Sequence, residues 1–406
     1  MESGLLGKRT VSCIVCVFVV PSLFLFPCQA MQQEAFMSTA QTLYVGGSGP
    51  GNYTTIQSAV DDASEGDTVF VYEDSAPYQE NVVIRVSICL LGEDRNTTSI
   101  EGGTHAVSIH ADGVTVRGFR ISNVGDFWNC CGFYVTSQEN MISENNIMNN
   151  YRMNGVYLDG ASYNTISGNL IAHNNFHGIR VEYGSHNVIM NNVIVNNRGY
   201  GIYLYEASDN LVVGNTIQQC FFDGMALGGQ SEQNVMYHNN FINNPSHAYD
   251  AVGNIWDNGS SGNYWSDYTG ADSNGDGIGD TPYLIPGNTS VDRFPLMAPF
   301  EQHPVDVAIT ISGPRGLRVL VKNQGVDALL AVEWDASFTG GLVLLPSERM
   351  SHGTILYLEA GEELRIIEIP RLVGLGFVEM TVSVGATSES LRGLLLFFVL
   401  FPLLSF

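Results

Sequence analysis

The chain has 406 residues, with 17 Lys and Arg against 41 Asp and Glu, for a formal charge of −24 at pH 7. This negative charge repels phosphate backbones and argues against nucleic acid as a partner. Charged residues make up only 14 % of the chain, while glycine contributes 44 residues. Few charges with much glycine predict a turn-rich β protein and argue against helical bundles and coiled coils.

The first 30 residues have the pattern of a secretory signal peptide. Lys8 and Arg9 precede an apolar run over Val11–Phe26, and Ala30 stands where cleavage is expected. We therefore predict a signal peptide over residues 1–30 and an extracellular or cell-surface protein. The alternative is an uncleaved signal that holds the chain at a membrane, although the apolar run is short for a span.

A segment over Tyr53–Ala63 predicts one short helix. Apolar residues recur at Ile56, Ala59 and Val60 with helical spacing. A threonine start and a stop at Gly66 bracket the segment. We expect this helix to cap the open end of the strands that follow, which would otherwise expose unpaired edges.

The middle of the chain is an internal repeat. Glycines recur every 23 residues, each before a short strand of alternating apolar residues, at Gly132, Gly155, Gly178, Gly201 and Gly224. Two asparagines follow at fixed positions in each repeat, namely Asn140 and Asn145, Asn164 and Asn169, Asn187 and Asn192, Asn210 and Asn215, and Asn234 and Asn239. The pattern predicts an all-β fold, a right-handed parallel β-helix of about eight coils between about residues 67 and 250. We expect the asparagines at the bends, in left-handed conformation, with amides that hydrogen-bond along the axis.

The chain resembles the NosD-like right-handed parallel β-helix proteins. The resemblance rests on the entry segment Tyr53–Ala63, the asparagine and glycine coils, and the closing stretch Gly262–Tyr268 with Asp272–Asp280 and Asp292–Met297. It implies a β-helix domain over residues 42–300, in a group that includes carbohydrate-binding proteins and sugar hydrolases. The family is named for a periplasmic protein of copper-enzyme maturation, so a copper-related role is implied by name only.

Composition changes after Phe300, and residues 305–406 form a second predicted domain. Seven short apolar runs punctuated by glycine and proline predict a β-sandwich similar to Ig-like modules. The runs are Val307–Ile311, Leu317–Val321, Leu329–Trp334, Leu342–Leu345, Thr354–Leu358, Leu364–Ile369 and Val378–Val384. The last apolar run, Leu394–Phe406, is short for a membrane span and is predicted as a final strand, with a membrane-associating tail as the alternative.

An acidic, glycine-rich loop has the spacing of a calcium site. Oxygen-bearing side chains at alternate positions, with glycine at the sixth, match an EF-hand type of loop. The predicted ligands of a structural Ca²⁺ are Asp272, Asn274, Asp276, the backbone carbonyl of Ile278, and Asp280. Tyr283 replaces the usual bidentate glutamate, so we expect Asp267 or Asp292 to supply the missing carboxylate.

Outward side chains of successive coils form a predicted ligand-binding face. One row holds Tyr134, Tyr157, Arg180 and Tyr203, and the row beside it holds Thr136, Asp159, Glu182 and Tyr205. Aromatic rings stack on sugars, so the face predicts a polysaccharide or cell-surface glycan as partner. Asp159 and Glu182 should lie one coil apart, at about 5 Å. That is the separation of the two carboxylates in a retaining glycosidase.

Histidines and cysteines offer a weaker metal hypothesis. His173, His177 and His186 lie around one coil, and they would form a copper site if they converge. Cys89, Cys130, Cys131 and Cys220 contain no CxxC pair and are expected to be mostly buried thiols.

The sequence is compatible with three functions. The leading hypothesis is polysaccharide binding without catalysis, supported by the aromatic row. The second is a polysaccharide-active hydrolase or lyase using Asp159, Glu182 and Arg180. The third is a structural surface spacer without a ligand.

Overall fold

The computed structural model describes residues 40–123, 130–150, 154–287 and 290–301, and further segments in the C-terminal region. Those segments are residues 307–312, 317–325, 329–345, 350–358, 361–369, 373–384, 387–397 and 399–402. The predicted signal peptide lies outside the described residues. Within them, no helix has both the length and the apolar character needed to cross a bilayer.

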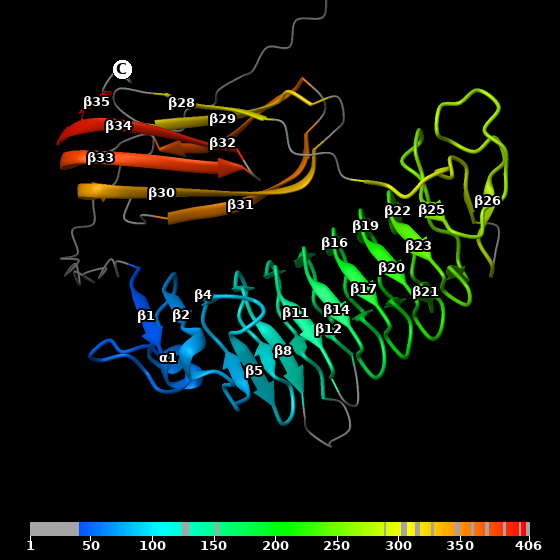
Figure 1. Ribbon diagram of the computed structural model, residues 1–406, viewed down its shortest axis with the longest axis horizontal. Coiled ribbons are helices and arrows are strands. Elements are labelled where there is room, and N and C mark those ends of the chain that lie inside the picture. The colour runs from blue at the N-terminus through cyan, green and yellow to red at the C-terminus, as the bar shows by residue number, and fades with distance from the viewer. Residues whose placement is uncertain are drawn as a thin grey trace, which may run out of the picture. The chain divides into compact units, whose positions relative to one another are not determined.

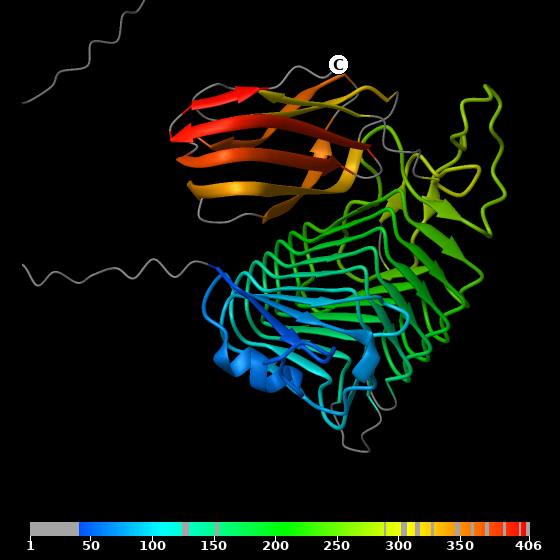
Figure 2. The ribbon, with the colours of Figure 1, turned by 60° about the vertical axis from the view of Figure 1, so that its left-hand side comes forward.

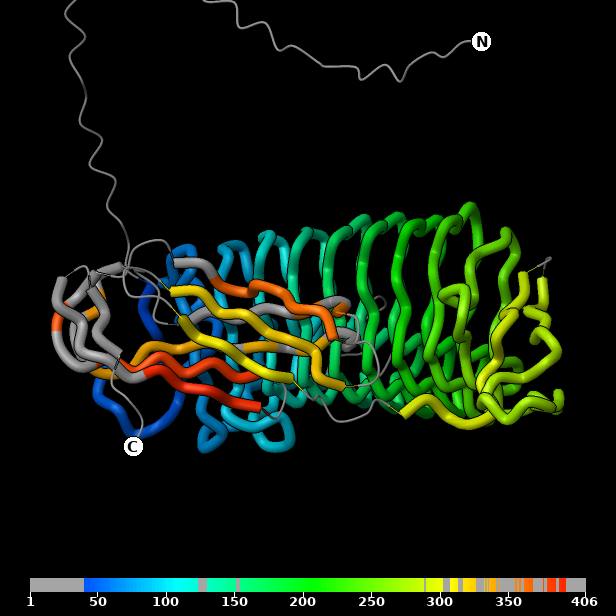
Figure 3. The backbone as a smooth tube through the Cα atoms, turned by 90° about the horizontal axis from the view of Figure 1, so that it is seen from above, coloured from blue at the N-terminus to red at the C-terminus, as the bar shows by residue number. Residues whose placement is uncertain are grey.

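The first part of the described chain is a parallel β-helix, as the repeat predicts. Its coils stack side by side, and the strands form three parallel sheets (Figures 1 and 3). Sheet A comprises β1 (Thr42–Val45), β2 (Thr68–Val71), β4 (Cys89–Gly92), β7 (Thr115–Arg117), β10 (Met141–Ser143), β13 (Thr165–Ser167), β16 (Val188–Met190), β19 (Leu211–Val213) and β22 (Val235–Tyr237). Sheet B comprises β5 (Ser99–Gly102), β8 (Arg120–Asn123), β11 (Asn146–Met148), β14 (Leu170–Ala172), β17 (Val193–Val195), β20 (Thr216–Gln218), β23 (Asn240–Ile242) and β25 (Tyr264–Trp265). Sheet C comprises β3 (Val82–Ile84), β6 (Val107–Ile109), β9 (Phe133–Val135), β12 (Val156–Asp159), β15 (Ile179–Glu182), β18 (Ile202–Tyr205), β21 (Met225–Gly228) and β24 (Ala248–Asp250).

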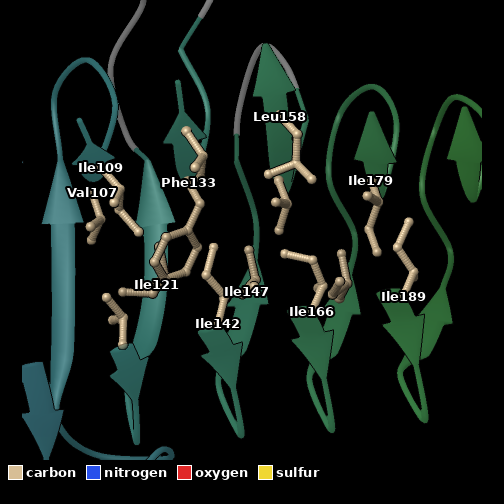
Figure 4. Close-up of a cluster of buried hydrophobic side chains, with 14 of the residues drawn as sticks. Val107, Ile109, Ile121, Phe133, Ile142, Ile147, Leu158, Ile166, Ile179 and Ile189 are labelled. Carbon is tan, nitrogen blue, oxygen red and sulfur yellow. The ribbon is translucent and has the colours of Figure 1, made fainter. Parts of the chain in front are cut away.

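Alternation within each strand builds the core. In β12, Val156 and Leu158 point inward and are fully buried, while Tyr157 between them points outward. Ile166 of β13 and Ile171 of β14 close the same coil from the other two sheets. Like residues stack on like from coil to coil, as Figure 4 shows for the aliphatic side chains between the sheets. Each such side chain contributes about 1.5–3 kcal/mol by burial.

Asparagine side chains line the inside of all three corners of the coil. The two predicted ladders are present, and each amide donates to the side-chain oxygen of the asparagine one coil further on. A third ladder, Asn150, Asn174 and Asn197, occupies the remaining corner. Cys220 replaces the next asparagine, and its backbone N–H donates to Asn244 at 3.0 Å. Buried backbone groups at the corners are therefore paired by side chains rather than by strands.

The expected conformation of these asparagines was wrong. The residue before each ladder asparagine takes the left-handed φ instead, for example Glu139 at 58°, His186 at 58° and Asn191 at 54°. That preceding residue turns the chain at the corner, and the asparagine that follows carries its amide into the buried interior. The turning position tolerates glutamate and histidine as well as asparagine, so it leaves no fixed residue type in the sequence.

The repeated glycines are required by close backbone contact between coils. A Cβ atom on Gly155 would lie 2.8 Å from the carbonyl oxygen of Gly178, and one on Gly201 would lie 2.5 Å from that of Gly224. Neither distance leaves room for a side chain, because the neighbouring atom belongs to the backbone. One glycine per coil therefore sets the 23-residue spacing seen in the sequence.

The ends of the stack are closed by apolar side chains. Helix α1 (Ile56–Asp62) lies at the N-terminal end of the stack (Figure 2). It begins after Thr55, whose side chain accepts from the backbone N–H of Ser58 at 3.3 Å, and it buries Ile56, Ala59 and Val60 in the core. The stack starts earlier than predicted, because β1 precedes the helix and pairs with β2. A short 3-10 helix, η1 (Glu73–Ser75), follows β2.

At the other end, Trp256 and Trp265 are buried. Their indole N–H groups donate to Asp250 at 3.0 Å and to Asp292 at 2.8 Å. A short hairpin of β26 (Tyr283–Leu284) and β27 (Val291–Asp292) completes this end. The closing stretch of the sequence therefore acts as a plug for the last coil.

The C-terminal region contains two antiparallel sheets that share one core. β28 (Val307–Ser312), β29 (Leu317–Asn323) and β32 (Glu363–Ile369) form the smaller sheet. β31 (Met350–Leu358), β30 (Leu329–Leu345), β33 (Val373–Val384), β34 (Thr387–Phe397) and β35 (Val399–Pro402) form the larger sheet. Buried residues of both sheets belong to one cluster, which is compatible with the predicted β-sandwich.

Two strand predictions in this region are revised. The runs Leu329–Trp334 and Leu342–Leu345 are parts of the single strand β30, which has a register shift between Gly340 and Leu342. The last apolar run is divided between the end of β34 and β35, which pair with each other. Residues 403–406 of that run lie outside the described part of the chain.

Replacing Asn192 by alanine should destabilise the β-helix by about 3–5 kcal/mol, because it leaves the buried backbone N–H of Asn169 without its side-chain partner and removes the hydrogen bonds of the Asn192 amide. The Asn192 amide donates to the carbonyl of Ile166 at 2.8 Å, and its oxygen accepts from the backbone N–H of Asn169 at 3.0 Å. The free energy of unfolding from urea titration measures the effect.

The control is Asn196→Gly, at an exposed corner position with a φ of 55° that glycine adopts readily. This variant should change stability by less than about 0.5 kcal/mol. Equal losses in the two variants would contradict a special role for the ladder.

Candidate functional site

The outward side of sheet C carries the predicted binding rows in the expected register. Tyr134, Tyr157 and Arg180 occupy paired positions of β9, β12 and β15, and Tyr203 continues the row in β18. In the second row, Asp159 is paired with Glu182 in register, and Glu182 with Tyr205. The parallel strands thus bring the predicted residues of this face together, apart from Thr136, which follows the end of β9 and contacts His110.

The two carboxylates are held by hydrogen bonds from the preceding coil. The Tyr134 hydroxyl donates to Asp159 Oδ2 at 2.8 Å, and the Tyr157 hydroxyl donates to Glu182 Oε2 at 2.5 Å. Arg180 Nη2 also lies 2.7 Å from Glu182 Oε2, and its guanidinium carbon lies 4.9 Å from the centre of the Tyr157 ring. Both acids therefore serve as acceptors within a network of neighbouring donors.

The tyrosines of this network keep their protons. Burial, with the hydrogen bond to Asp159, raises the pKa of Tyr134 to about 12. Burial also raises the pKa of Tyr157 well above its ordinary value, with a further contribution from the hydrogen bond to Glu182. Only 7 % of Tyr157 is exposed, so this ring faces outward but is covered by its neighbours. The prediction that Tyr157 presents a stacking surface is therefore not supported by its burial.

Further aromatic side chains lie beside Tyr203 and Tyr205. The Tyr200 ring stacks on Tyr203 with 5.1 Å between centres, and Phe222 lies 5.5 Å from Tyr200. On the other side, Tyr183 lies 6.2 Å from Tyr205. Sequence reasoning missed Tyr183, Tyr200 and Phe222, because these corner residues do not recur with the period of the repeat.

The three histidines do not form the expected copper site. His173 and His186 are exposed at corner positions, and His186 stacks on Tyr163 with 4.8 Å between ring centres. His177 is buried instead, and its Nδ1 accepts from the backbone N–H of Tyr200 at 3.0 Å. Burial, with a smaller effect of nearby Arg180, lowers the pKa of His177 to about 3. His177 therefore packs neutral beside the rings of the face.

The acidic loop folds around its own backbone N–H groups. Asp272 accepts from the N–H groups of Gly275 at 2.7 Å and Gly277 at 2.9 Å, and Asp280 accepts from Ser273 at 2.9 Å. The Asn274 amide donates to Asp276 at 2.8 Å. Across the described residues, no group of three or more His, Cys, Asp or Glu side chains is arranged to hold a metal ion. Calcium binding by this loop stays a prediction.

Asp292 does not supply the missing carboxylate of that loop. It is buried and accepts from the backbone N–H of Asn263 at 2.7 Å, the indole of Trp265 at 2.8 Å and the N–H of Phe294 at 3.0 Å. Burial raises the pKa of Asp292 to about 6. Asp267 is largely exposed, and its Oδ1 lies 3.2 Å from His247 Nε2. The sequence order of these acids gave no sign that Asp292 belongs to the buried plug.

Comparison with known proteins adds one family match and several distant structural similarities. A profile of the family described as "Periplasmic copper-binding protein (NosD)" matches residues 60–270, just over half of the chain. A search of curated proteins finds no match.

The solved structures that are similar share little sequence with the chain. The pectate lyase Pel9A has 13 % identity and a TM-score of 0.45, over 58 % of this chain and 72 % of its own. The enzymatically active domain of tailspike protein 2 from bacteriophage CBA120 has 12 % identity and a TM-score of 0.39, over 88 % and 71 %. An alginate lyase from Paenibacillus sp. has 13 % identity and a TM-score of 0.33, over 55 % and 94 %.

The described residues do not fit the copper ion that the family description implies. They contain no cluster of three or more His, Cys, Asp or Glu ligands around one point. Cys130, Cys131 and Cys220 are buried, and burial raises the pKa of Cys131 and of Cys220 to about 12. A protonated thiol is a poor metal ligand, because the thiolate is the form that binds. No copper chemistry is therefore derived for these residues.

Calcium should raise the melting temperature if the acidic loop binds it, because an ion that binds only the folded state stabilises that state by about 2.7 kcal/mol at 100 times its Kd. Thermal unfolding with millimolar CaCl₂ measures the shift. MgCl₂ at equal concentration controls for ionic strength, and Asp272→Asn should abolish the response. An unchanged melting temperature would show that this loop does not bind calcium under these conditions.

Acid should destabilise the protein through His177. An unfolded histidine takes up a proton near pH 6.5, whereas the native His177 does so only near pH 3. The folded state therefore has its full stability with respect to His177 above pH 6.5. It loses stability as the pH falls toward 3, because the unfolded chain takes up the proton first. Between pH 7 and pH 4.5 the expected loss is about 2–3 kcal/mol.

The matched variant is His177→Asn, because Asn154 holds the equivalent place one coil earlier. Urea unfolding at the two pH values should show a smaller loss for this variant than for the wild type. Identical pH dependence in the two proteins would show that His177 is not the cause.

Proposed function

We propose that this chain, which belongs to the NosD family of parallel β-helix proteins, binds a neutral polysaccharide on the outward side of sheet C without catalysing a reaction. The observation that carries the proposal is where exposed aromatic rings gather. Strongly exposed rings stand at both corners of the coil beside strand β18 of sheet C, namely Tyr183 at one and Phe221 and Phe222 at the other. We place the protein outside the cytoplasm, in the periplasm or at the cell surface, because the family is described as periplasmic and the first 30 residues have a signal pattern.

Exposed rings on a fixed scaffold suit the flat apolar faces of sugars. Tyrosine offers an apolar ring together with a hydroxyl that pairs with sugar hydroxyls, at little cost in side-chain entropy. Tyr203 and Tyr205, which lie between the exposed corner rings, stand on strand β18, whose register is fixed by the coils on both sides. Such a pre-formed surface loses little freedom when a ligand binds.

The charges on the face favour a neutral sugar over an acidic one. Arg180 is already paired with Glu182, and Asp159 has only the Tyr134 hydroxyl as its side-chain donor among the described residues. The face therefore carries a net negative charge, within a chain whose formal charge is −24. A polymer of uronic acids would be repelled by both.

Hydrolysis is the second candidate function, because Asp159 and Glu182 stand one coil apart in register. A glycosidase pair needs one carboxyl group that carries a proton for the leaving group. Here Asp159 already accepts a hydrogen bond from Tyr134, and Glu182 accepts one from Tyr157 and is paired with Arg180, so both carboxyl groups are occupied within the face. This arrangement suits binding better than acid catalysis.

Native electrophoresis through gels that contain polysaccharides tests the proposal. Neutral glucan, xylan or mannan should retard the wild-type protein, whereas pectate and alginate should not, and no gel should show a cleared zone. Tyr203→Ala should abolish the retardation. The control is Tyr44→Ala, an equally small change at a ring that is 43 % exposed on sheet A.

Cleared zones that disappear with Asp159→Asn or Glu182→Gln would establish the hydrolase or lyase instead. Free migration in every gel, with and without calcium, would leave the structural spacer as the function.

A further inference from the structure

We infer that the sugar chain lies along strand β18, perpendicular to the axis of the β-helix, rather than down that axis. The inference rests on the proposed function and adds the direction and the subsites of binding. The surface in question is called the ring track and consists of Phe222, Tyr200, Tyr203, Tyr205 and Tyr183. Three of these residues come from β18 and the corner before it, and one comes from each neighbouring coil.

The rings of the track follow one another without a gap. Starting from Phe222, the successive centre-to-centre distances are 5.5 Å to Tyr200, 5.1 Å to Tyr203, 6.1 Å to Tyr205 and 6.2 Å to Tyr183. Both end rings are open to solvent, with Phe222 45 % and Tyr183 58 % exposed. An extended polymer can therefore enter at one corner of the coil and leave at the other.

No such continuity exists along the axis. The neighbours of Tyr203 in adjacent coils are Arg180 and Ala226, and the neighbours of Tyr205 are Glu182 and Gly228. A chain running down the axis would therefore meet a charged pair on one side and small residues on the other. From Tyr203 and Tyr205, ring contacts among the described residues continue to the exposed rings through Tyr200 and Tyr183, at the two ends of the strand.

The hydroxyl of Tyr203 is available, unlike those of its counterparts in earlier coils. Tyr134 and Tyr157 each donate to an acid one coil further on, at Asp159 and Glu182. At the corresponding place one coil beyond Tyr203 stands Gly228, whose added Cβ would lie 3.2 Å from the Tyr203 hydroxyl oxygen. Among the described residues, none replaces the missing acid as a partner, so this hydroxyl is left for a ligand.

The track also has a polar border and a rigid support. Arg180 and Glu182, with side chains 22 % and 13 % exposed, flank Tyr203 and Tyr205 on the side of the preceding coil. Sugar hydroxyls that point to that side meet a donor and an acceptor. Beneath the rings, buried His177 lies 5.0 Å from Tyr200 and 5.1 Å from Tyr203, which fixes their orientation.

Alanine variants of the two end rings test the direction of binding. Tyr183→Ala and Phe222→Ala remove exposed side chains and should leave folding intact, as circular dichroism and the melting temperature would verify. Each should weaken binding of the neutral polysaccharide that retards the wild type by about tenfold, a usual cost for an aromatic anchor. The dissociation constant is measured by affinity electrophoresis at graded polysaccharide concentrations.

Two matched variants complete the test. Tyr163→Ala removes an equally exposed ring that lies outside the track, and Tyr249→Ala removes a ring two strands further along the axis from Tyr203. Both should bind within about twofold of wild type. A loss in Tyr249→Ala with normal binding in Tyr183→Ala would overturn the inference in favour of axial binding.

The outcomes also separate this inference from the proposed function. If the wild type binds a glycan and both end-ring variants bind it equally well, the ring track is wrong while glycan binding stands. If the wild type binds no glycan, both fail together.

Discussion

Hydrogen bonding by buried asparagine amides at the corners is the interaction on which the rest of the structure depends. Backbone N–H groups of the ladder asparagines are paired by the side-chain oxygen of the asparagine one coil further on, and leaving one of them unpaired costs about 1–3 kcal/mol. Asn192, for example, pairs with Met190 of its own coil, with Ile166 and Asn169 of the preceding coil and with Asn215 of the next. Coils that are locked in this way cannot slip in register. The outward side chains of sheet C therefore hold fixed positions, which is the property a binding face requires.

Fixed register has a chemical consequence for the acids of this face. Carboxylates that stack one coil apart repel each other unless donors lie between them. Tyr134, Tyr157 and Arg180 supply those donors for Asp159 and Glu182. The first half of the predicted aromatic row therefore serves the acids, and it is not free to bind sugar. The proposed binding surface therefore lies on β18, where the following coil has Gly228 at the position of the acid.

The sequence predicted what recurs and missed what does not. Glycine and asparagine at constant spacing led directly to the parallel β-helix, and the rows from Tyr134 to Tyr203 followed from the same period. The third ladder was not predicted, because Cys220 interrupts it. Strand β1 was not predicted as part of the stack, because α1 separates it from the repeats. Tyr183, Tyr200 and Phe222 are corner residues that do not recur with the period of the repeat. Only the folded chain brings them beside Tyr203, so the subsites depend on contacts that no periodic pattern encodes.

The difference between recurring and non-recurring residues also explains why the residues that determine the fold differ from those that form the outward surface. Inward residues are constrained at every coil, because one altered position disturbs the stacking on both sides. Outward residues are constrained only by their two neighbours in register and by the corners. A few substitutions on one strand can therefore alter the outward surface without changing the fold, and Gly228 beside Tyr203 stands at such a position. Under the proposed function, the side chains of β15, β18 and β21, rather than the fold or the family, determine which ligand is bound.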